Sequence, residues 1–173
     1  MAENRKFIPL SIAILTVSDS RTEATDKSGN FLVQRVADAK HKLFEKKICK
    51  DDIYVIRAIA SEWIATLEPD VIITTGGTGV TGRDGTPEAV VPLFDKTLEG
   101  FGEMFRVLSY EDIKTSTLQS RATAGVANAT YIFALPGSPG ACKLAWDSLI
   151  AHQLDMTTRP CNLVELMPRL LEK

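Results

Sequence analysis

A buried strand that runs directly into a glycine-rich loop is the feature that most constrains what this chain can fold into. The segment Asp70-Val71-Ile72-Ile73-Thr74-Thr75 is short, apolar and rich in β-branched residues, as expected of a strand covered on both faces. The ten residues that follow, 76–85, contain five glycines, more than a single tight turn requires. In open α/β sheets, loops at the carboxyl ends of strands form the ligand site. The sequence therefore predicts an α/β protein with a ligand-binding loop at one edge of its sheet.

Other segments alternate between strand and helix patterns around this central strand. Residues 11–17, 46–49 and 130–135 are predicted strands. Three helices are predicted from caps: one begins at Ser28, one at Asp51 or Asp52, and one at Thr86, with Pro87 in its first turn. Two more are predicted at about 102–108 and after the 136–140 turn. Strands alternating with helices predict a mainly parallel sheet covered on both faces.

The length of 173 residues, without a linker or an internal repeat, predicts one domain over residues 7–167 with flexible ends at 1–6 and 168–173. The net charge is −2 and no basic stripe is present, which argues against nucleic-acid binding. The sequence contains no run of about 18 apolar residues, so we expect no membrane span. It also lacks a secretory signal pattern, so the expected compartment is the cytoplasm.

Cysteine and histidine are too few and too scattered for the commoner catalytic centres. Three cysteines occur without CxxC spacing, and the two histidines, His41 and His152, are far apart and are expected at the surface. The small number and wide spacing of these residues argue against a zinc site and against Ser-His-Asp catalysis.

The chemistry of the glycine loop favours an anion. Glycines let backbone N–H groups approach a phosphate closely, and Thr78 adds a hydroxyl. The P-loop pattern fails because no lysine follows a suitable glycine. Gly77, Gly79 and Gly82 do match GxGxxG, so a nicotinamide- or flavin-dependent oxidoreductase is an alternative, but the third glycine is followed by further loop instead of lying in a helix.

Two carboxylates follow neighbouring strands at the predicted edge. Asp84 closes the glycine loop and Asp51 follows the 46–49 strand, so together they could hold Mg²⁺ against nucleotide phosphates. Asp51 could instead be a helix cap and Asp84 an ordinary turn residue. Ser138 could offer a hydroxyl to the same anion, cap the following helix, or do both.

At these residues the sequence resembles the molybdenum-cofactor biosynthesis family, the MoaB/MogA fold. The signature is Thr75-Gly76-Gly77-Thr78-Gly79 with Arg83-Asp84 and Thr86-Pro87-Glu88. Residues 12–19, 100–106, 120–121 and 135–138 also look like family segments, and 158–162 resembles the MoaB branch.

The resemblance implies a three-layer α/β/α fold, a homotrimer or homohexamer, and molybdopterin as ligand. Active members are adenylyltransferases that use ATP and Mg²⁺ to activate the terminal phosphate of molybdopterin, and a non-catalytic carrier of the same pathway is the alternative. Other proteins of cofactor biosynthesis are possible partners.

The family's residues carry over by position. Asp84 and Asp51 match the acidic positions expected for catalysis and for Mg²⁺. Phosphate- or pterin-binding positions are matched by Gly76, Gly77, Thr78, Gly79, Ser138, Ser18, Asp19, Ser120 and Arg121. This chain departs from many members at Gly140, where they carry lysine, and at Gly85, where an apolar residue is more usual. Loss of the lysine would weaken phosphate neutralisation, which keeps the non-catalytic alternative open.

Overall fold

The computed structural model describes residues 5–172 and centres on a six-stranded sheet with the order β2-β1-β3-β6-β5-β4. The parallel strands are β1 (Ser11–Val17), β2 (Lys42–Cys49), β3 (Val71–Thr75) and β6 (Thr130–Leu135). Two further strands, β5 (Thr123–Ala127) and β4 (Lys96–Thr97), continue the sheet in the antiparallel sense. The predicted mainly parallel α/β fold is therefore confirmed.

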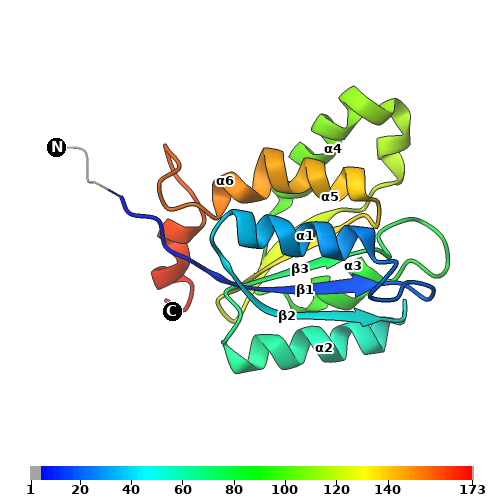
Figure 1. The fold of residues 1–173 in the computed structure, drawn as a ribbon, viewed down its shortest axis with the longest axis horizontal. Coiled ribbons are helices and arrows are strands. Elements are labelled where there is room, and N and C mark those ends of the chain that lie inside the picture. Colours follow the sequence, from blue (N-terminus) through cyan, green and yellow to red (C-terminus); the bar gives the residue numbers. More distant parts are fainter. Residues whose placement is uncertain (1–4, 173) are drawn as a thin grey trace.

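Helices cover both faces of the sheet, which gives three layers (Figure 1). Helices α1 (Lys27–Asp38), α4 (Glu99–Ile113) and α5 (Pro139–Ala145) pack on one face, and α2 (Ile53–Thr66) and α3 (Thr86–Val90) pack on the other. A π-helical turn (Trp146–Ile150) and α6 (Ala151–Gln153) continue α5, and 3-10 turns cover Val91–Leu93, Lys114–Gln119 and Val164–Arg169.

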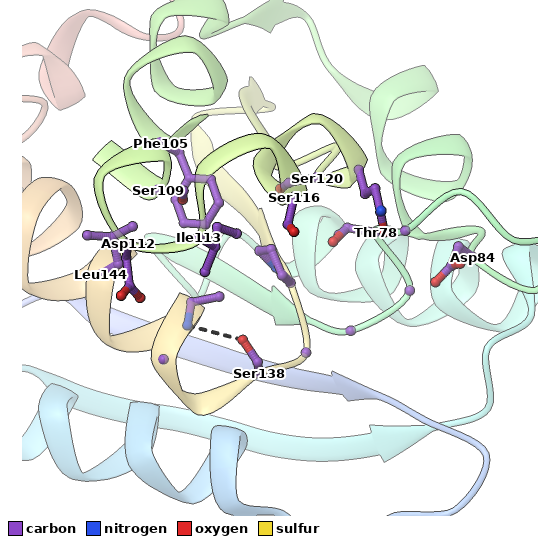
Figure 2. A pocket seen from close by; sticks show the side chains of 18 residues that line it. Thr78, Asp84, Phe105, Ser109, Asp112, Ile113, Ser116, Ser120, Ser138 and Leu144 are labelled. Atoms are coloured by element: carbon purple, nitrogen blue, oxygen red, sulfur yellow. Dashed lines mark hydrogen bonds between the residues drawn. The ribbon is translucent and has the colours of Figure 1, made fainter. Parts of the chain in front are cut away.

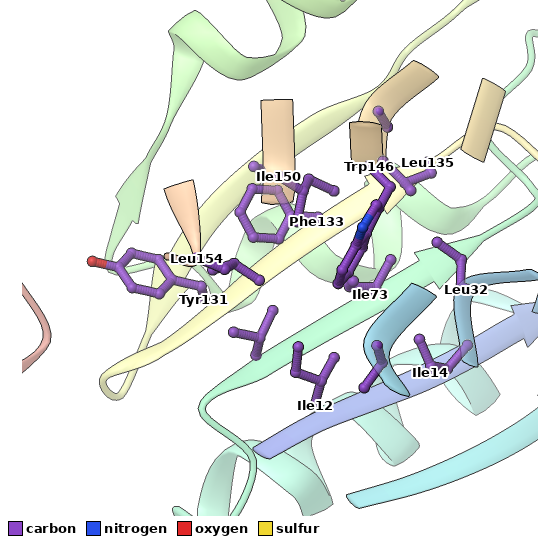
Figure 3. Packing of buried hydrophobic residues seen from close by; sticks show 14 of the residues in the cluster. Ile12, Ile14, Leu32, Ile73, Tyr131, Phe133, Leu135, Trp146, Ile150 and Leu154 are labelled. Atoms are coloured by element: carbon purple, nitrogen blue, oxygen red, sulfur yellow. The ribbon is translucent and has the colours of Figure 1, made fainter. Parts of the chain in front are cut away.

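Alternation along the buried strands divides the core between the two faces. Ile12 and Ile14 of β1 join the cluster beneath α1 and α5, which includes the almost completely buried Phe133 and Trp146 (Figure 3). The intervening Ala13 and Leu15 join the cluster on the α2 side. Because successive side chains of a strand point to opposite faces, one apolar segment supplies both cores.

Several local predictions were wrong. Asp26, not Ser28, caps α1, because its carboxylate accepts a hydrogen bond from the Gly29 N–H at 2.8 Å. The strand predicted at 46–49 begins at Lys42, because β2 is an edge strand whose mostly half-exposed side chains mix charged and apolar types and so form no continuous apolar run. The helix predicted at 102–108 extends over Glu99–Ile113.

His41 also departs from expectation, because it is buried instead of lying at the surface. Only 7% of the residue is exposed, its Nδ1 accepts a hydrogen bond from the Leu10 N–H at 3.1 Å, and its ring lies near those of Phe7 and Trp146. An imidazole with a backbone donor and aromatic neighbours is accommodated in a core.

The predicted flexible ends fall partly outside the described residues, namely at 1–4 and 173. Within the described part, Arg5 pairs with Glu165 at 2.6 Å, and Leu170 packs against the core beyond the last helical turn. No helix in residues 5–172 combines the length and apolar character needed to cross a membrane.

Parallel pairing brings the carboxyl ends of strands β2, β1, β3 and β6 to one edge. The register places Val17 beside Cys49, Thr16 beside Thr75, and Thr75 beside Leu135. The loops that follow these strands, including the glycine loop, therefore meet at this edge, on the opposite side of the molecule from both ends of the described chain (Figure 1).

Candidate functional site

The glycine loop leaves β3 in a backbone conformation that other residues rarely adopt. Gly76 has φ +105° and Gly77 has φ +64°. A Cβ on Gly76 would lie 2.2 Å from the Val17 carbonyl oxygen, and one on Gly77 would lie 2.5 Å from the Thr86 hydroxyl. Both glycines are therefore required by backbone shape and by close packing.

A cavity of about 690 Å³ opens beside this loop (Figure 2). Gly76–Gly79 and Asp84 form one wall, and the turn 136–138 with Gly140 and Ala141 forms the floor. The opposite wall comes from α4 and the 3-10 turn after it, with Phe105, Ser109, Asp112, Ile113, Ser116, Gln119 and Ser120. The volume suits a ligand of drug size, with polar groups at the loop end and apolar side chains beyond.

Ser138 lines this cavity and also caps α5. Its hydroxyl oxygen accepts a hydrogen bond from the Ala141 N–H at 3.2 Å, the contact drawn in Figure 2. Gly140 lies at the same turn, and a Cβ placed there would meet no atom within 4 Å. The structure thus leaves room for a side chain at 140 that this sequence does not supply.

Asp84 and Asp51 flank the glycine loop. The Asp84 carboxylate accepts hydrogen bonds from the Thr81 N–H at 2.8 Å and the Thr81 hydroxyl at 2.6 Å, and it lies against Gly79. Asp51 Oδ1 accepts a bond from the Gly85 N–H at 3.2 Å. Asp52, not Asp51, caps α2, which leaves the Asp51 carboxylate facing the loop.

The two carboxylates differ in their acidity. The Thr81 hydroxyl is the main cause that lowers the pKa of Asp84 below its ordinary value, with help from backbone N–H groups of Thr81 and Gly79 and from Arg121. Burial raises the pKa of Asp51, and the nearby charges of Asp84 and Asp19 raise it further. Asp51 therefore carries an electrostatic cost that a bound cation would relieve.

The carboxylate oxygens of Asp51 and Asp84 are donors of the kind that Mg²⁺ binds. Within residues 5–172, no group of three or more His, Cys, Asp and Glu side chains is arranged to hold a metal ion by itself. Mg²⁺ commonly takes one or two carboxylates and completes its shell with water and substrate phosphates. Asp51 and Asp84 would supply the carboxylates.

The remaining predicted site residues lie around the loop and not all in the cavity. Ser120 lines the cavity. Asp19 pairs with Arg83, and the Ser18 hydroxyl oxygen accepts bonds from the N–H groups of Ser20 and Arg21. Ser18 faces a second cavity of about 330 Å³, which shares Gly137 with the first.

Arg121 turns its guanidinium onto the loop and away from the cavity. Its Nε donates to the Gly79 carbonyl at 2.7 Å, one terminal nitrogen donates to the Asp84 carbonyl at 2.8 Å, and the other pairs with Glu88. Of the residues that the structure describes, no lysine or arginine lines the 690 Å³ cavity, whose charged lining residues are Asp84 and Asp112.

The sequence reasoning missed most of the wall contributed by α4 and the turn 114–119. Ser109 and Asp112 lie one helical turn apart, a spacing that could have marked a polar helix face, but nothing in the sequence indicates that this face closes over the glycine loop. Thr86 was also assigned wrongly, since Gly85 precedes α3 and the Thr86 hydroxyl donates to the Gly76 carbonyl at 2.8 Å.

Fold and site together define an α/β protein with a cavity beside a glycine-rich loop at the carboxyl edge of a mainly parallel sheet. Comparison with known families matches residues 13–156 to one described as "Probable molybdopterin binding domain". The chain is 57% identical over 157 residues to molybdenum cofactor biosynthesis protein B of Escherichia coli K12, covering 91% of this chain and 92% of that protein. It is 44% identical over 147 residues to the Bacillus subtilis protein of the same name, covering 84% and 86%.

Solved structures agree. A crystal structure of molybdenum cofactor biosynthesis protein B matches with a TM-score of 0.82 at 44% identity, covering 85% of this chain and 92% of that one. The tungsten cofactor synthesizing protein MoaB from Pyrococcus furiosus matches with a TM-score of 0.75 at 37% identity, covering 83% and 92%. This chain belongs to the molybdopterin-binding family of MoaB and MogA, as the sequence signature predicts.

Proposed function

We propose that this protein binds molybdopterin and acts in molybdenum cofactor biosynthesis, adenylylating the terminal phosphate of molybdopterin with Mg-ATP. The observation that carries the proposal is a glycine loop with positive φ at Gly76 and Gly77, which borders a ligand-sized cavity and is flanked by Asp51 and Asp84. Family membership and the names of the relatives support the pathway.

In the proposed reaction, a terminal phosphate oxygen of molybdopterin attacks the α-phosphorus of ATP. The bond from that phosphorus to the bridging oxygen breaks, and pyrophosphate leaves. Such a transfer depends on positioning and on charge stabilisation, without a need for a covalent nucleophile. The absence of histidine and cysteine from the cavity lining in the described chain is consistent with this chemistry.

The carboxylates have separate roles in the proposal. When bound, Mg²⁺ would neutralise phosphate charge. Asp84, whose pKa is lowered mainly by the Thr81 hydroxyl, presents a carboxylate that Thr81 holds in place at the mouth of the loop. Asp51, whose pKa is raised, gains most from a neighbouring cation.

The second candidate is a non-catalytic molybdopterin-binding protein of the same pathway. The cavity lining favours it, because Gly140 supplies no cation and the Arg121 guanidinium is bonded to the loop. Without such a charge, pyrophosphate would be poorly stabilised as a leaving group. This candidate predicts binding of the pterin without turnover.

Self-association into a trimer or hexamer is also proposed. Five large apolar side chains on α4 and the following turn are 47–79% exposed, namely Met104, Val107, Tyr110, Ile113 and Leu118. Apolar side chains gathered on one helix are typical of a surface that packs against another chain. Light scattering that finds only an 18.9 kDa particle would contradict self-association.

The experiment for the catalytic proposal is a turnover assay with molybdopterin, ATP and Mg²⁺, followed by detection of pyrophosphate and adenylylated pterin. Wild type should form product and Asp84→Ala should form none. Asp155→Ala is a matched control, because Asp155 accepts equivalent bonds from the Thr157 N–H and hydroxyl at 2.8 and 2.7 Å, away from the cavity. Pterin binding without product would favour the second candidate, and absence of binding would remove both.

A further inference from the structure

The first four carbonyl groups of the glycine loop, those of residues 76–79, each accept a hydrogen bond from Thr86 or Arg121. The Gly76 carbonyl accepts from the Thr86 hydroxyl at 2.8 Å, and the Gly77 carbonyl accepts from the Thr86 N–H at 2.9 Å. The Thr78 carbonyl accepts from the Arg121 N–H at 3.1 Å, and the Gly79 carbonyl accepts from Arg121 Nε at 2.7 Å. Two residues therefore hold four consecutive peptide groups.

Fixing these carbonyls also fixes the N–H groups that follow them. In a trans peptide, the carbonyl of one residue and the N–H of the next point in opposite directions. The cis peptide bond found in the described chain is Arg159-Pro160, so the loop peptides are trans. The Gly76 and Gly77 carbonyls, both bonded to Thr86, consequently turn the N–H groups of Gly77 and Thr78 to the opposite side of the loop. The Thr78 and Gly79 carbonyls, bonded to Arg121, fix the next two peptide groups, which carry the N–H groups of Gly79 and Val80.

These two N–H groups are available to a ligand. Gly77 and Thr78 both line the cavity, and neither N–H has a hydrogen-bond partner within residues 5–172. By contrast, the Gly76 N–H donates to the Leu135 carbonyl at 3.0 Å. Successive free N–H groups in a loop with positive φ form a concavity suited to a phosphate oxygen.

We propose that Thr86 is a positioning residue, which holds the Gly76 and Gly77 carbonyls away from the cavity so that the N–H groups of Gly77 and Thr78 can bind the ligand phosphate, and that Arg121 supports this arrangement by holding the two peptide groups that follow. This rests on the proposed molybdopterin function. It gives Arg121 a different role from direct phosphate binding, because its guanidinium is already engaged with Gly79, Asp84 and Glu88. Thr86, fully buried, acts entirely through the loop.

The test at Thr86 compares two substitutions that differ mainly in the hydroxyl. Thr86→Val removes the donor to Gly76 and should weaken molybdopterin binding at least tenfold by calorimetry, whereas Thr86→Ser should retain affinity close to wild type. Thr130→Val is the matched stability control, because the buried Thr130 hydroxyl donates to the Pro69 carbonyl at 3.1 Å, where the chain enters β3. It should lose stability without losing affinity.

The test at Arg121 separates positioning from simple charge. Arg121→Lys keeps the cation but cannot reproduce a planar fork that reaches two carbonyls, so it should bind molybdopterin as weakly as Arg121→Met. Recovery of affinity in Arg121→Lys would overturn the positioning role of Arg121. Equal affinity of wild type and Thr86→Val would overturn that of Thr86.

A second readout does not depend on the ligand. In the free protein, the amide NMR signals of Gly77 and Thr78 should shift in Thr86→Val and stay in place in Thr86→Ser and Thr130→Val. Unmoved signals in Thr86→Val would overturn the proposal. Wild type that binds no molybdopterin would refute the proposed function and, with it, the ligand role of the loop, whereas intact binding in every variant would refute the positioning role alone.

Discussion

Gly76→Ala should destabilise the protein far more than an alanine at another glycine of the same loop. Gly76 has φ +105°, and its missing Cβ would lie 2.2 Å from the Val17 carbonyl oxygen at the end of β1. Gly82, six residues later, has no atom within 4 Å of its Cβ position. The two substitutions add the same methyl group, at Gly76 where there is no room for it and at Gly82 where there is open space.

The cost at Gly76 has two parts. A non-glycine residue in so sparsely populated a region of φ costs about 1–3 kcal/mol. The contact with Val17 is more than 1 Å shorter than ordinary packing and involves backbone, so relieving it costs about 1–3 kcal/mol more, as overpacking commonly does. We expect a total loss of roughly 2–6 kcal/mol of unfolding free energy, a large part of the stability of a single domain.

Urea unfolding followed by tryptophan fluorescence measures this loss, because Trp63 and Trp146 are 2% and 3% exposed and report on opposite sides of the sheet. Gly82→Ala should stay within about 0.5 kcal/mol of wild type. The reasoning would be refuted by a Gly76→Ala protein as stable as wild type, or by equal losses in the two variants.

Two further predictions concern charge at the site. Because the pKa of Asp51 is raised on folding, the folded state binds its proton more tightly, and stability falls as pH rises through that pKa. Asp51→Asn should therefore raise the urea midpoint of the metal-free protein at neutral pH, with the gain disappearing near pH 3; a gain that persists there would contradict the electrostatic cause. Gly140→Lys should place a cation in the cavity and tighten pyrophosphate binding without Mg²⁺ by about tenfold in calorimetry, whereas Gly140→Ala should not. Equal affinity of the two variants would show that position 140 does not face the bound anion.

The parallel part of the fold was predictable because its strands are apolar and β-branched. The predicted strands 11–17 and 130–135 match β1 and β6 to the residue, and the strand before the glycine loop is β3. Strand β5, with the sequence Thr-Ala-Gly-Val-Ala, was not predicted, because its small residues give no strong strand pattern. Gly125 is needed there, since Phe94 occupies the place of its side chain.

The site was predictable at its loops and not at its far wall. Glycines, aspartates and Ser138 are recognisable from sequence because each has a local chemical reason to follow a strand. The placement of Ser109 and Asp112 over the cavity depends on how α4 packs across the sheet, which no local pattern specifies. Arg121 illustrates the same limit, because a basic residue near a glycine loop suggests ligand binding, whereas its guanidinium is bonded to Gly79, Asp84 and Glu88.

The most direct test of the central claim is a crystal structure of the protein with molybdopterin bound. The account predicts the terminal phosphate in the 690 Å³ cavity, within hydrogen-bonding distance of the N–H groups of Gly77 and Thr78, with the Arg121 guanidinium still bonded to the loop. A phosphate bound instead in the neighbouring 330 Å³ cavity, against Arg21 and Lys27, would contradict it.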